Sequence, residues 1–331
     1  MRALDPQENG AGSLIAGPIL LTGAGGDIGV SLARVLREAL PDVLLVGADC
    51  DSDAAGAEFV DRFFTLPRAD DPGYLSALSN LIAAQSVGIV IPLAEAELAR
   101  LAHEGVLAGE LAGSAIITAN ARAVRTGLDK AATALALKQA GIGVPQTGIV
   151  GEDEPGDFDC IIKPRSGQGS KGLRHAKRTE FDALVPAHRG ELWQRWLKDE
   201  MSEFTCGVAR FSAMKTRSIC LRRSLQGGLT GKGEVVHDKA LTQVCEQVAA
   251  ALDLEGAINI QLRMDAGKPM IFEISPRFSS TVGFRHRLGF TDVIWSVQAR
   301  LGLEIASYCA PAAGTRIERV AQEVIRPPLP A

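Results

Sequence analysis

The stretch from Pro18 to Leu36, PILLTGAGGDIGVSLARVL, decides the fold class of the first part of the chain. It starts with an apolar run, passes through the glycine-rich turn Gly23–Gly29 and continues with apolar residues at helical spacing, which predicts a strand, a turn and a helix. Apolar runs at Val43–Gly47 and Val87–Ile91, the second after a helical pattern at Tyr74–Gln85, predict two further strands. This βαβ order predicts a parallel, doubly wound α/β sheet.

The pattern changes beyond residue 120. A helix is predicted at Leu128–Gln139, where Gly141 would cap it, and strands are predicted at Cys160–Lys163 and around Leu192–Leu197. This part is expected to be α+β. The predicted parts are a mobile tail at 1–17, a Rossmann-like domain at 18–120, a central subdomain at 121–190 and a C-terminal subdomain at 191–331.

Length and composition narrow the class of protein. At 331 residues the chain is longer than one core usually is, and its net charge of -4 gives no sign of a nucleic-acid-binding surface. The six cysteines lie far apart without a C-x-x-C pair, which favours buried free thiols over a zinc site. No apolar run could span a bilayer and the start lacks a signal-peptide pattern, so we expect a cytoplasmic protein without membrane contact.

The turn Gly23–Gly29 has two interpretations. Its glycines, with Asp49 after the second strand, fit a dinucleotide site of an NAD(P)-dependent nucleotide-sugar oxidoreductase or epimerase. Such enzymes need a Tyr-x-x-x-Lys pair, yet neither Tyr74 nor Tyr308 is followed by lysine four positions later. The alternative is that the glycines only allow close packing of strand and helix.

A second glycine-rich segment follows the strand that ends at Lys163. The loop Ser166–Gly172 would offer movable backbone N–H donors beside a fixed cation, which suits a polyphosphate. Its spacing is not that of a Walker A motif. The alternative, a mobile surface loop, leaves the Lys163 ammonium against an apolar strand, where it is costly without a partner.

Two segments alternate apolar and polar residues on either side of Asp265–Lys268 and predict an antiparallel hairpin. If the turn centres on its glycine, Gln261 lies across from Glu273 and Asn259 across from Ser275. The residues expected on the opposite face are Ile260, Leu262, Phe272 and Ile274.

Carboxylate and amide oxygens that meet in this way suit Mg²⁺ together with phosphate oxygens. Arg277, just after the hairpin, would add a cation for a transferred phosphoryl group. The alternative is that Glu273 pairs only with Arg263 or Arg277.

The segment Trp193–Leu197, followed by Glu203, is a weaker candidate. A strand in a cleft can offer backbone groups to adenine, and a nearby carboxylate can accept from ribose hydroxyls. Core packing explains the tryptophan and leucine equally well.

Taken in order, these motifs resemble the ATP-grasp superfamily. They are most similar to the large subunit of carbamoyl phosphate synthetase and to small amino-acid ligases of bacterial surface-sugar clusters, from Pro18 to about Ser307. The motifs that carry the resemblance are Asp129-Lys130, Lys163-Pro164, the loop Ser166–Gly172, Gln194 with Glu203, Gln261, and Phe272–Phe278.

The resemblance implies a Rossmann-like preATP-grasp domain followed by an ATP-grasp fold whose two lobes enclose ATP, with Mg²⁺ as a further cofactor. It makes Arg277 and Lys163 catalytic and assigns the metal to Gln261, Glu273 and Ser275. Ser275 departs from the asparagine that the family usually has, so this ligand would reach the metal less directly. The implied ATP contacts are Lys130, Lys163, Ser166, Gly167, Gly169, Ser170, Gly172, Gln194, Arg195, Trp196, Leu197 and Glu203.

Substrate contacts are predicted from charge at Arg222, Arg223, Arg285 and Glu95, although solvated surface positions or a helix start would explain these residues as well. The expected activity is an ATP- and Mg²⁺-dependent ligase that joins a small carboxylate, an amino acid in the first instance, to an amine through an acyl phosphate. The alternatives are the oxidoreductase above and an ATP-binding protein without turnover. The sequence leaves a homo-oligomer open.

Overall fold

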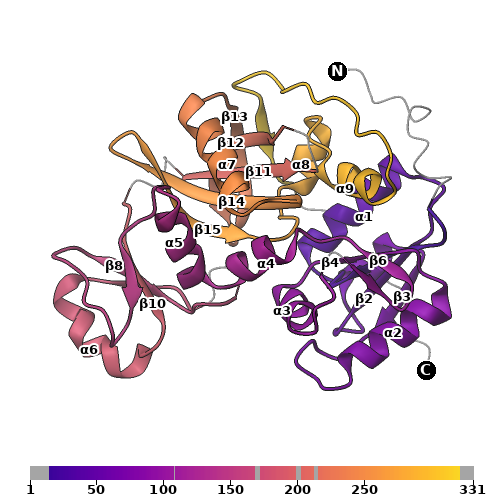
Figure 1. The fold of residues 1–331 in the computed structure, drawn as a ribbon, viewed down its shortest axis with the longest axis horizontal. Helices are drawn as coiled ribbons and strands as arrows, with labels where there is room; N and C mark the ends of the chain where they lie inside the picture. Colours follow the sequence, from indigo (N-terminus) through magenta and orange to yellow (C-terminus); the bar gives the residue numbers. More distant parts are fainter. Residues whose placement is uncertain (1–14, 108, 168–171, 199–202, 212–214, 321–331) are drawn as a thin grey trace.

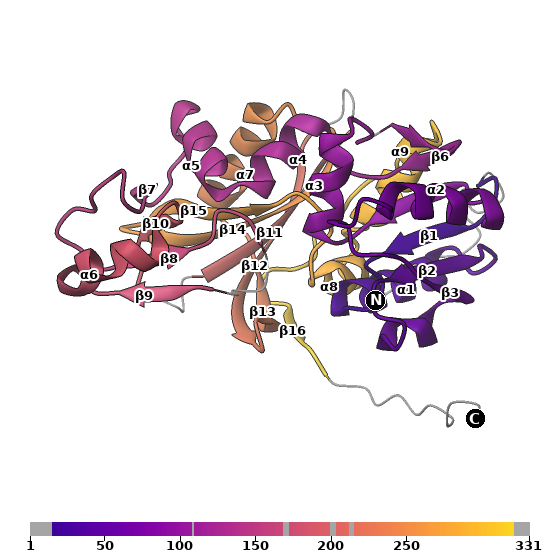
Figure 2. The same ribbon diagram turned by 90° about the horizontal axis from the view of Figure 1, so that it is seen from below.

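The computed structural model describes residues 15–107, 109–167, 172–198, 203–211 and 215–320. Figures 1 and 2 show an elongated molecule with the N-terminal sheet at one end, a small sheet with helix α6 at the other and a larger sheet between them. Most of the predicted tail lies outside the described residues. Ile15, at its end, is partly buried and packs against the core. No helix in the described part of the chain combines the length and apolar character required to cross a membrane.

The N-terminal sheet has the order β3-β2-β1-β4-β6-β5, and all its pairs are parallel except β5 with β6. Alternate residues of β1 face opposite layers: Ile19 and Leu21 pack in the core that contains α1, and Leu20 in the core that contains α2. The doubly wound sheet is therefore confirmed. Its elements are β1 (Ile19–Thr22), α1 (Asp27–Ala39), β2 (Leu45–Asp49), η3 (Ala55–Phe59), β3 (Arg62–Thr65), α2 (Tyr74–Gln85), β4 (Ile89–Pro92), α3 (Glu95–His103), β5 (Glu110–Leu111) and β6 (Ser114–Ile116).

The helix predicted at Leu128–Gln139 is present as α5 (Lys130–Gln139), which starts two residues later than predicted, and a separate helix, α4 (Ala121–Leu128), comes before it. Asp129 separates them because its backbone is extended and its side chain accepts hydrogen bonds from the N–H groups of Ala131 and Ala132. An aspartate in this position caps a new helix and does not continue the old one. This break places Lys130 at the first turn of α5.

The small sheet has the order β7-β10-β8-β9 with antiparallel pairs. Its own core contains Phe181 and Trp193, whose rings meet edge to face at 6.5 Å. The elements are β7 (Thr147–Ile149), β8 (Cys160–Lys163), β9 (Arg174–Ala176), α6 (Arg178–His188) and β10 (Leu192–Arg195).

The large sheet has the order β15-β14-β11-β12-β13-β16. Helix α7 covers one face, and the other face shares a core with α1, α8 and α9, so the N-terminal domain rests directly on the large sheet. The elements are β11 (Glu203–Arg210), β12 (Arg217–Gln226), β13 (Leu229–Val236), α7 (Lys239–Ala251), β14 (Gly256–Asp265), β15 (Lys268–Ser275), α8 (Val282–Arg287), α9 (Asp292–Arg300) and β16 (Arg316–Glu318). The predicted change from α/β to α+β is confirmed.

The hairpin β14–β15 pairs Gln261 with Glu273 and Asn259 with Ser275, as predicted. The reason differs from the one expected, because Asp265 pairs with Lys268 around a two-residue turn and an irregularity after Gln261 shifts the register. The placement of Phe272 on the core face was wrong for the same reason. Across the irregularity Leu262 pairs with Ile271, which takes the buried position, and Phe272 turns towards a cavity.

Candidate active site

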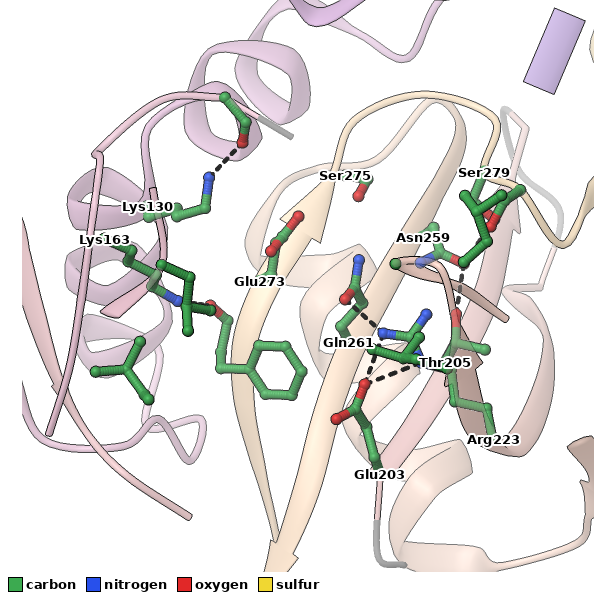
Figure 3. Close-up of a pocket in the computed structure, with 18 of the residues that line it drawn as sticks. Lys130, Lys163, Glu203, Thr205, Arg223, Asn259, Gln261, Glu273, Ser275 and Ser279 are labelled. Carbon is green, nitrogen blue, oxygen red and sulfur yellow. Dashed lines mark hydrogen bonds and ion pairs between the residues drawn. The ribbon is translucent and has the colours of Figure 1, made fainter. Parts of the chain in front are cut away.

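A cavity of about 610 Å³ lies where the three sheets meet. Its walls come from the glycine-rich turn before α1, the start of α5, strands β8 and β10, and strands β11, β14 and β15. Figure 3 shows Lys130 and Lys163 on one side of Glu273, with Gln261, Arg223 and Glu203 on the other. Side chains from distant parts of the sequence therefore face one space.

Lys163 ends β8 with its side chain in the cavity wall and only 7% exposed. Its Nζ donates to Oε1 of Gln194 at 3.0 Å and to the backbone oxygen of Phe272 at 3.2 Å, so it links the small sheet to the large one. Burial lowers the pKa of Lys163 to about 8; Glu273 opposes this shift and Lys130 adds to it. The group is a cation whose charge is easily lost without a bound anion.

Lys130 reaches the cavity from the start of α5. Its Nζ donates to the backbone oxygen of Gly167 at 2.7 Å, and the backbone N–H of Lys130 donates to the oxygen of Arg165 at 2.9 Å. Ser166 and Gly167 line the cavity, whereas Gly172 does not. The predicted contacts Gly169 and Ser170 lie outside the described residues.

Glu273 and Ser275 both line the cavity from β15. The alternative pairing of Glu273 is contradicted, because Arg263 pairs with Glu203 and Arg277 pairs with Glu95. A carboxylate, an amide and a hydroxyl on adjacent strands form a set of hard oxygen donors that fits Mg²⁺. Oε1 of Gln261 accepts a hydrogen bond from Arg223 at 2.7 Å, which competes with a metal for this oxygen.

Glu203 is held by two arginines in the cavity wall. Its Oε1 accepts from Nε and Nη2 of Arg223 at 3.0 and 2.8 Å, and its Oε2 accepts from Nε and Nη2 of Arg263 at 3.1 and 2.6 Å. A carboxylate has about four acceptor positions, and the two arginines use four. Glu203 therefore holds Arg223 and Arg263 in place, and its contact with ribose stays a prediction.

Gln194 also contacts other protein groups in the cavity wall. Its side-chain oxygen accepts from Lys163, and its amide group donates to Oγ1 of Thr147 at 3.0 Å. Gln194 therefore orients Lys163, and its contact with ribose stays a prediction.

Arg195, Trp196 and Leu197 all line the cavity, as expected for the adenine end. Arg195 forms an ion pair with Asp265, and the Trp196 ring lies edge to face against His175 at 4.1 Å. The backbone oxygen of Leu197 accepts from Arg263. This carbonyl is therefore already used, and flat apolar surface is the main feature that these residues offer.

Arg277 lines the cavity just after β15. Its Nη2 lies 3.2 Å from Oε1 of Glu95, the first residue of α3, and both side chains are about one-tenth exposed. Burial raises the pKa of Glu95, while Arg277 opposes this effect. Glu95 supports Arg277 from behind and does not itself line the cavity.

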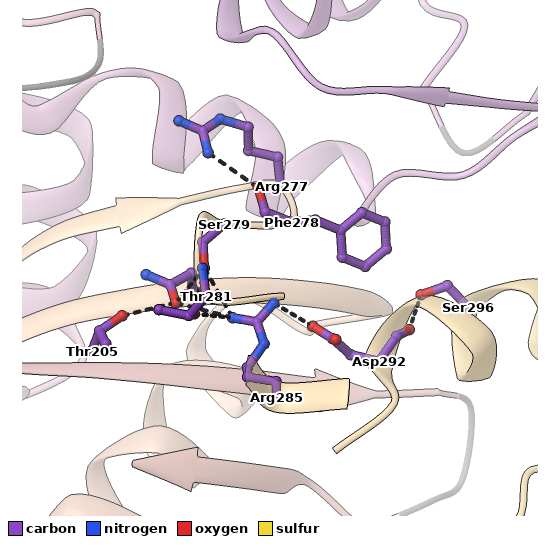
Figure 4. Close-up of polar contacts among 9 residues, drawn as sticks. Thr205, Arg277, Phe278, Ser279, Thr281, Arg285, Asp292 and Ser296 are labelled. Atoms are coloured by element: carbon purple, nitrogen blue, oxygen red, sulfur yellow. Dashed lines mark hydrogen bonds and ion pairs between the residues drawn. The ribbon is translucent and has the colours of Figure 1, made fainter. Parts of the chain in front are cut away.

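Two of the predicted substrate arginines do not face the cavity. Arg285 is 1% exposed and forms a buried ion pair with Asp292 at 2.7 Å (Figure 4). Its Nη1 also donates to Oδ1 of Asn259 at 3.2 Å. Arg222 lies on the surface, where it pairs with Glu234. Side chains alternate along β12, so only Arg223 points inwards.

Sequence reasoning missed the buried polar network behind the metal candidates. Oδ1 of Asn259 accepts from Thr205, Ser279 and Arg285, which fixes the amide in the cavity wall. Figure 3 shows Asn259 between Thr205 and Ser279. A signal was present, since Glu203 and Thr205 alternate with apolar residues along β11. Polar side chains at every second position of a buried strand indicate a face that lines a cavity.

The glycine-rich turn borders the cavity through Gly23 and Gly26. Asp49 contacts the turn itself, because its Oδ2 accepts a hydrogen bond from the backbone N–H of Gly25 at 2.8 Å. A Cβ at Gly29 would stand against the backbone oxygen of Ala24, closer than van der Waals contact allows. The turn therefore serves close packing, which weighs against the dinucleotide interpretation.

Comparisons with known proteins agree with this arrangement. The family model "ATP-grasp in the biosynthetic pathway with Ter operon" matches residues 200–323, and the model "PylC-like, N-terminal domain" matches residues 19–108. The carbamoyl-phosphate synthase of Methanobrevibacter smithii is 29% identical over 136 residues, which are 39% of this chain and 36% of that relative. The chain thus matches little more than a third of the relative's length.

Solved structures resemble nearly the whole chain. N5-carboxyaminoimidazole synthetase from Staphylococcus aureus, complexed with ADP, has a TM-score of 0.70 at 17% identity, covering 88% of this chain and 78% of that one. A biotin carboxylase complex with β-γ-ATP from Campylobacter jejuni has a TM-score of 0.67 at 14% identity, covering 89% and 73%. The sequence matches cover residues 19–108 and 200–323, and the solved structures share the fold of nearly the whole chain, so the chain is similar in these parts to ATP-grasp proteins and to carbamoyl-phosphate synthase.

Proposed function

We propose that this protein is an ATP- and Mg²⁺-dependent carboxylate–amine ligase that works through an acyl phosphate. The observation that carries the proposal is that Lys163 and Glu273, from two different sheets, face the same cavity. Cations on one side and hard oxygen donors on the other are what a metal-bound triphosphate requires. The two lobes are residues 121–190 and 191–331, and the domain before them is 18–120.

The triphosphate is bound by charge and by backbone groups. Lys130 and Lys163 neutralise phosphate oxygens, and Ser166 and Gly167 lie in the same cavity wall and offer backbone groups. Glu273, Ser275 and Gln261 are the residues that would hold Mg²⁺. When bound, Mg²⁺ would neutralise charge on the phosphate oxygens. The adenine lies against Trp196 and Leu197.

The chemistry takes place near Arg277. A substrate carboxylate oxygen attacks the γ-phosphorus, the bond from that phosphorus to the β–γ bridging oxygen breaks, and ADP leaves. The amine nitrogen then attacks the acyl carbon, phosphate leaves and the amine loses a proton. The Arg277 guanidinium stabilises charge on the phosphoryl oxygens in both steps, so the protein acts mainly by positioning and electrostatics.

The substrate end of the cavity supports a small carboxylate. The turn before α1 faces it, and Gly26 at the N-cap has no side chain to occupy the first N–H groups of this helix. Such N–H groups attract a carboxylate. With the Arg223 guanidinium in the same cavity, an amino acid or another small carboxylate is the expected substrate class. We expect the reaction to take place in the cytoplasm, on small molecules.

The test is product analysis with purified protein. ADP and phosphate should form only when Mg²⁺, a carboxylate and an amine are all present, with amino acids and amino sugars as the first substrates screened. Release of AMP would refute the acyl-phosphate route. Binding of ATP without turnover in any combination, together with turnover gained by Ser275→Asn, would instead identify a binding protein.

A further inference from the structure

Three cysteines from three elements meet between the large sheet and helix α7, away from the cavity described above. Cys206 on β11 and Cys220 on β12 are direct cross-strand partners, and Cys245 on α7 packs over them. Their Sγ atoms all lie within 4.8 Å of one another, and none of the three residues is more than 5% exposed. Among the described residues, no other set of three His, Cys, Asp or Glu side chains converges in this way.

The spacing suits one metal ion bound by three sulfur atoms. Metal–sulfur bonds of about 2.3 Å place three sulfurs roughly 4 Å apart in a trigonal site. To bind one ion, each sulfur would therefore move by about 1 Å or less. Cysteine sulfur is a soft ligand that prefers ions such as Zn²⁺ or Cu⁺ to Mg²⁺.

The three thiols interact with one another through hydrogen bonds between their side chains. Metal ions bind the deprotonated sulfur of cysteine, so each thiol gives up its proton when it binds.

A second cavity gives access to the cysteine cluster. A second cavity of about 790 Å³ lies between the ends of β12 and β13, the start of α7 and the segment around Tyr308, and Cys220 lines it. Figure 1 shows α7 over β11 and β12, where the three cysteines lie. His237 also lines this cavity, beside the entrance to the cluster.

We propose that Cys206, Cys220 and Cys245 form a binding site for one thiophilic metal ion, entered through this second cavity. Each thiol exchanges its proton for a sulfur–metal bond, so three protons are released when all three sulfurs bind. A divalent ion leaves one net negative charge in the apolar core and a monovalent ion leaves two, which favours Zn²⁺ over Cu⁺. The site is independent of the ligase activity.

The test uses the full chain, reduced and freed of metal, with Cd²⁺ as a spectroscopic probe for Zn²⁺. A sulfur-to-metal charge-transfer band in the ultraviolet should grow to saturation at one equivalent. Cys206→Ser, Cys220→Ser and Cys245→Ser should each weaken Zn²⁺ binding at least tenfold. Cys160→Ser is the matched control, because Cys160 is equally buried but lies in the core of the small sheet. A Cu⁺ titration tests the choice of ion.

A second measurement does not depend on the variants folding. X-ray absorption at the zinc edge of the wild-type protein with one equivalent of Zn²⁺ should show a shell of sulfur atoms at about 2.3 Å. A shell of oxygen and nitrogen alone, or a cadmium band that disappears in the double variant Cys50→Ser, Cys309→Ser, would overturn the proposal. Both of those thiols are exposed.

Discussion

At the scale of single residues, the candidate site depends on buried charges that hold one another. Lys163 donates a hydrogen bond to Gln194, and Glu203 forms ion pairs with two arginines. Charges removed from water are costly unless partners surround them, so each of these groups has a measurable effect on stability or on binding.

The first prediction concerns the pH dependence of ATP binding. Because burial lowers the pKa of Lys163 to about 8, the free protein carries this charge below pH 8 and loses it as the pH rises. Triphosphate binds the charged form, so ATP affinity should fall by about tenfold per pH unit above pH 8. Titration calorimetry from pH 7 to 9.5 measures this.

Lys163→Arg is the control, because a guanidinium keeps its charge throughout this range. Its ATP affinity should stay nearly constant between pH 8 and 9.5. If wild type and variant lose affinity with the same slope, Lys163 is not the group that titrates.

The second prediction concerns Glu203. Glu203→Gln removes the negative charge between Arg223 and Arg263 and should lower the free energy of unfolding by about 3–5 kcal/mol, the cost of breaking a buried ion pair. The control is Glu234→Gln at the exposed pair with Arg222, which should cost less than about 1 kcal/mol. Urea unfolding measures both, and equal losses would contradict the buried role.

At the scale of elements, the close contact between the turn before α1 and the helix itself limits which glycines could carry a side chain. A Cβ at Gly29 would meet the backbone oxygen of Ala24, whereas a Cβ at Gly26 would meet nothing within 4 Å. Both residues have ordinary negative φ, so the difference between them is one of space.

The third prediction follows from this contrast. Gly29→Ala should lower the free energy of unfolding by about 1–3 kcal/mol, since β1 and α1 must move apart. Gly26→Ala should change it by less than about 1 kcal/mol. Thermal unfolding of the two variants compares them, and a larger loss for Gly26→Ala would show that the turn is not limited by packing.

At the scale of the whole molecule, two ion pairs among the described residues join the N-terminal domain to the segments that follow β15. Arg277 pairs with Glu95 beside the cavity, and Arg300 pairs with Glu110 on the surface. Both pairs link residues far apart in the sequence, yet only the first borders the proposed reaction site.

The fourth prediction separates chemistry from domain contact. Arg277→Met should lower kcat about 100-fold or more, the usual loss when a donor to transition-state charge is removed, with much less effect on ATP binding. Arg300→Met removes a contact between the same two parts and should leave kcat within about threefold. Equal losses of kcat would mean that Arg277 acts only through domain placement.

Local patterns determined much of the fold. The bounds of α2 and β8 follow from periodicity. The pairs Gln261–Glu273 and Asn259–Ser275 were also predicted, but an irregularity after Gln261, which the sequence did not reveal, sets them. The bounds are predictable because side-chain spacing repeats over a few residues and depends on few distant contacts. The start of α5 was predicted two residues too early because an aspartate fits the first turn of a helix as well as its cap.

The sequence by itself determined the α/β and α+β parts and the elements that carry the lysines and acids. Only the tertiary structure decided what those side chains do. Gln194 orients Lys163, Glu203 holds two arginines, and Arg285 is buried with Asp292. The physical reason is that most of these partners lie 20 or more residues away. Local periodicity sets the direction of a side chain, but the charge it meets depends on how distant strands pack together.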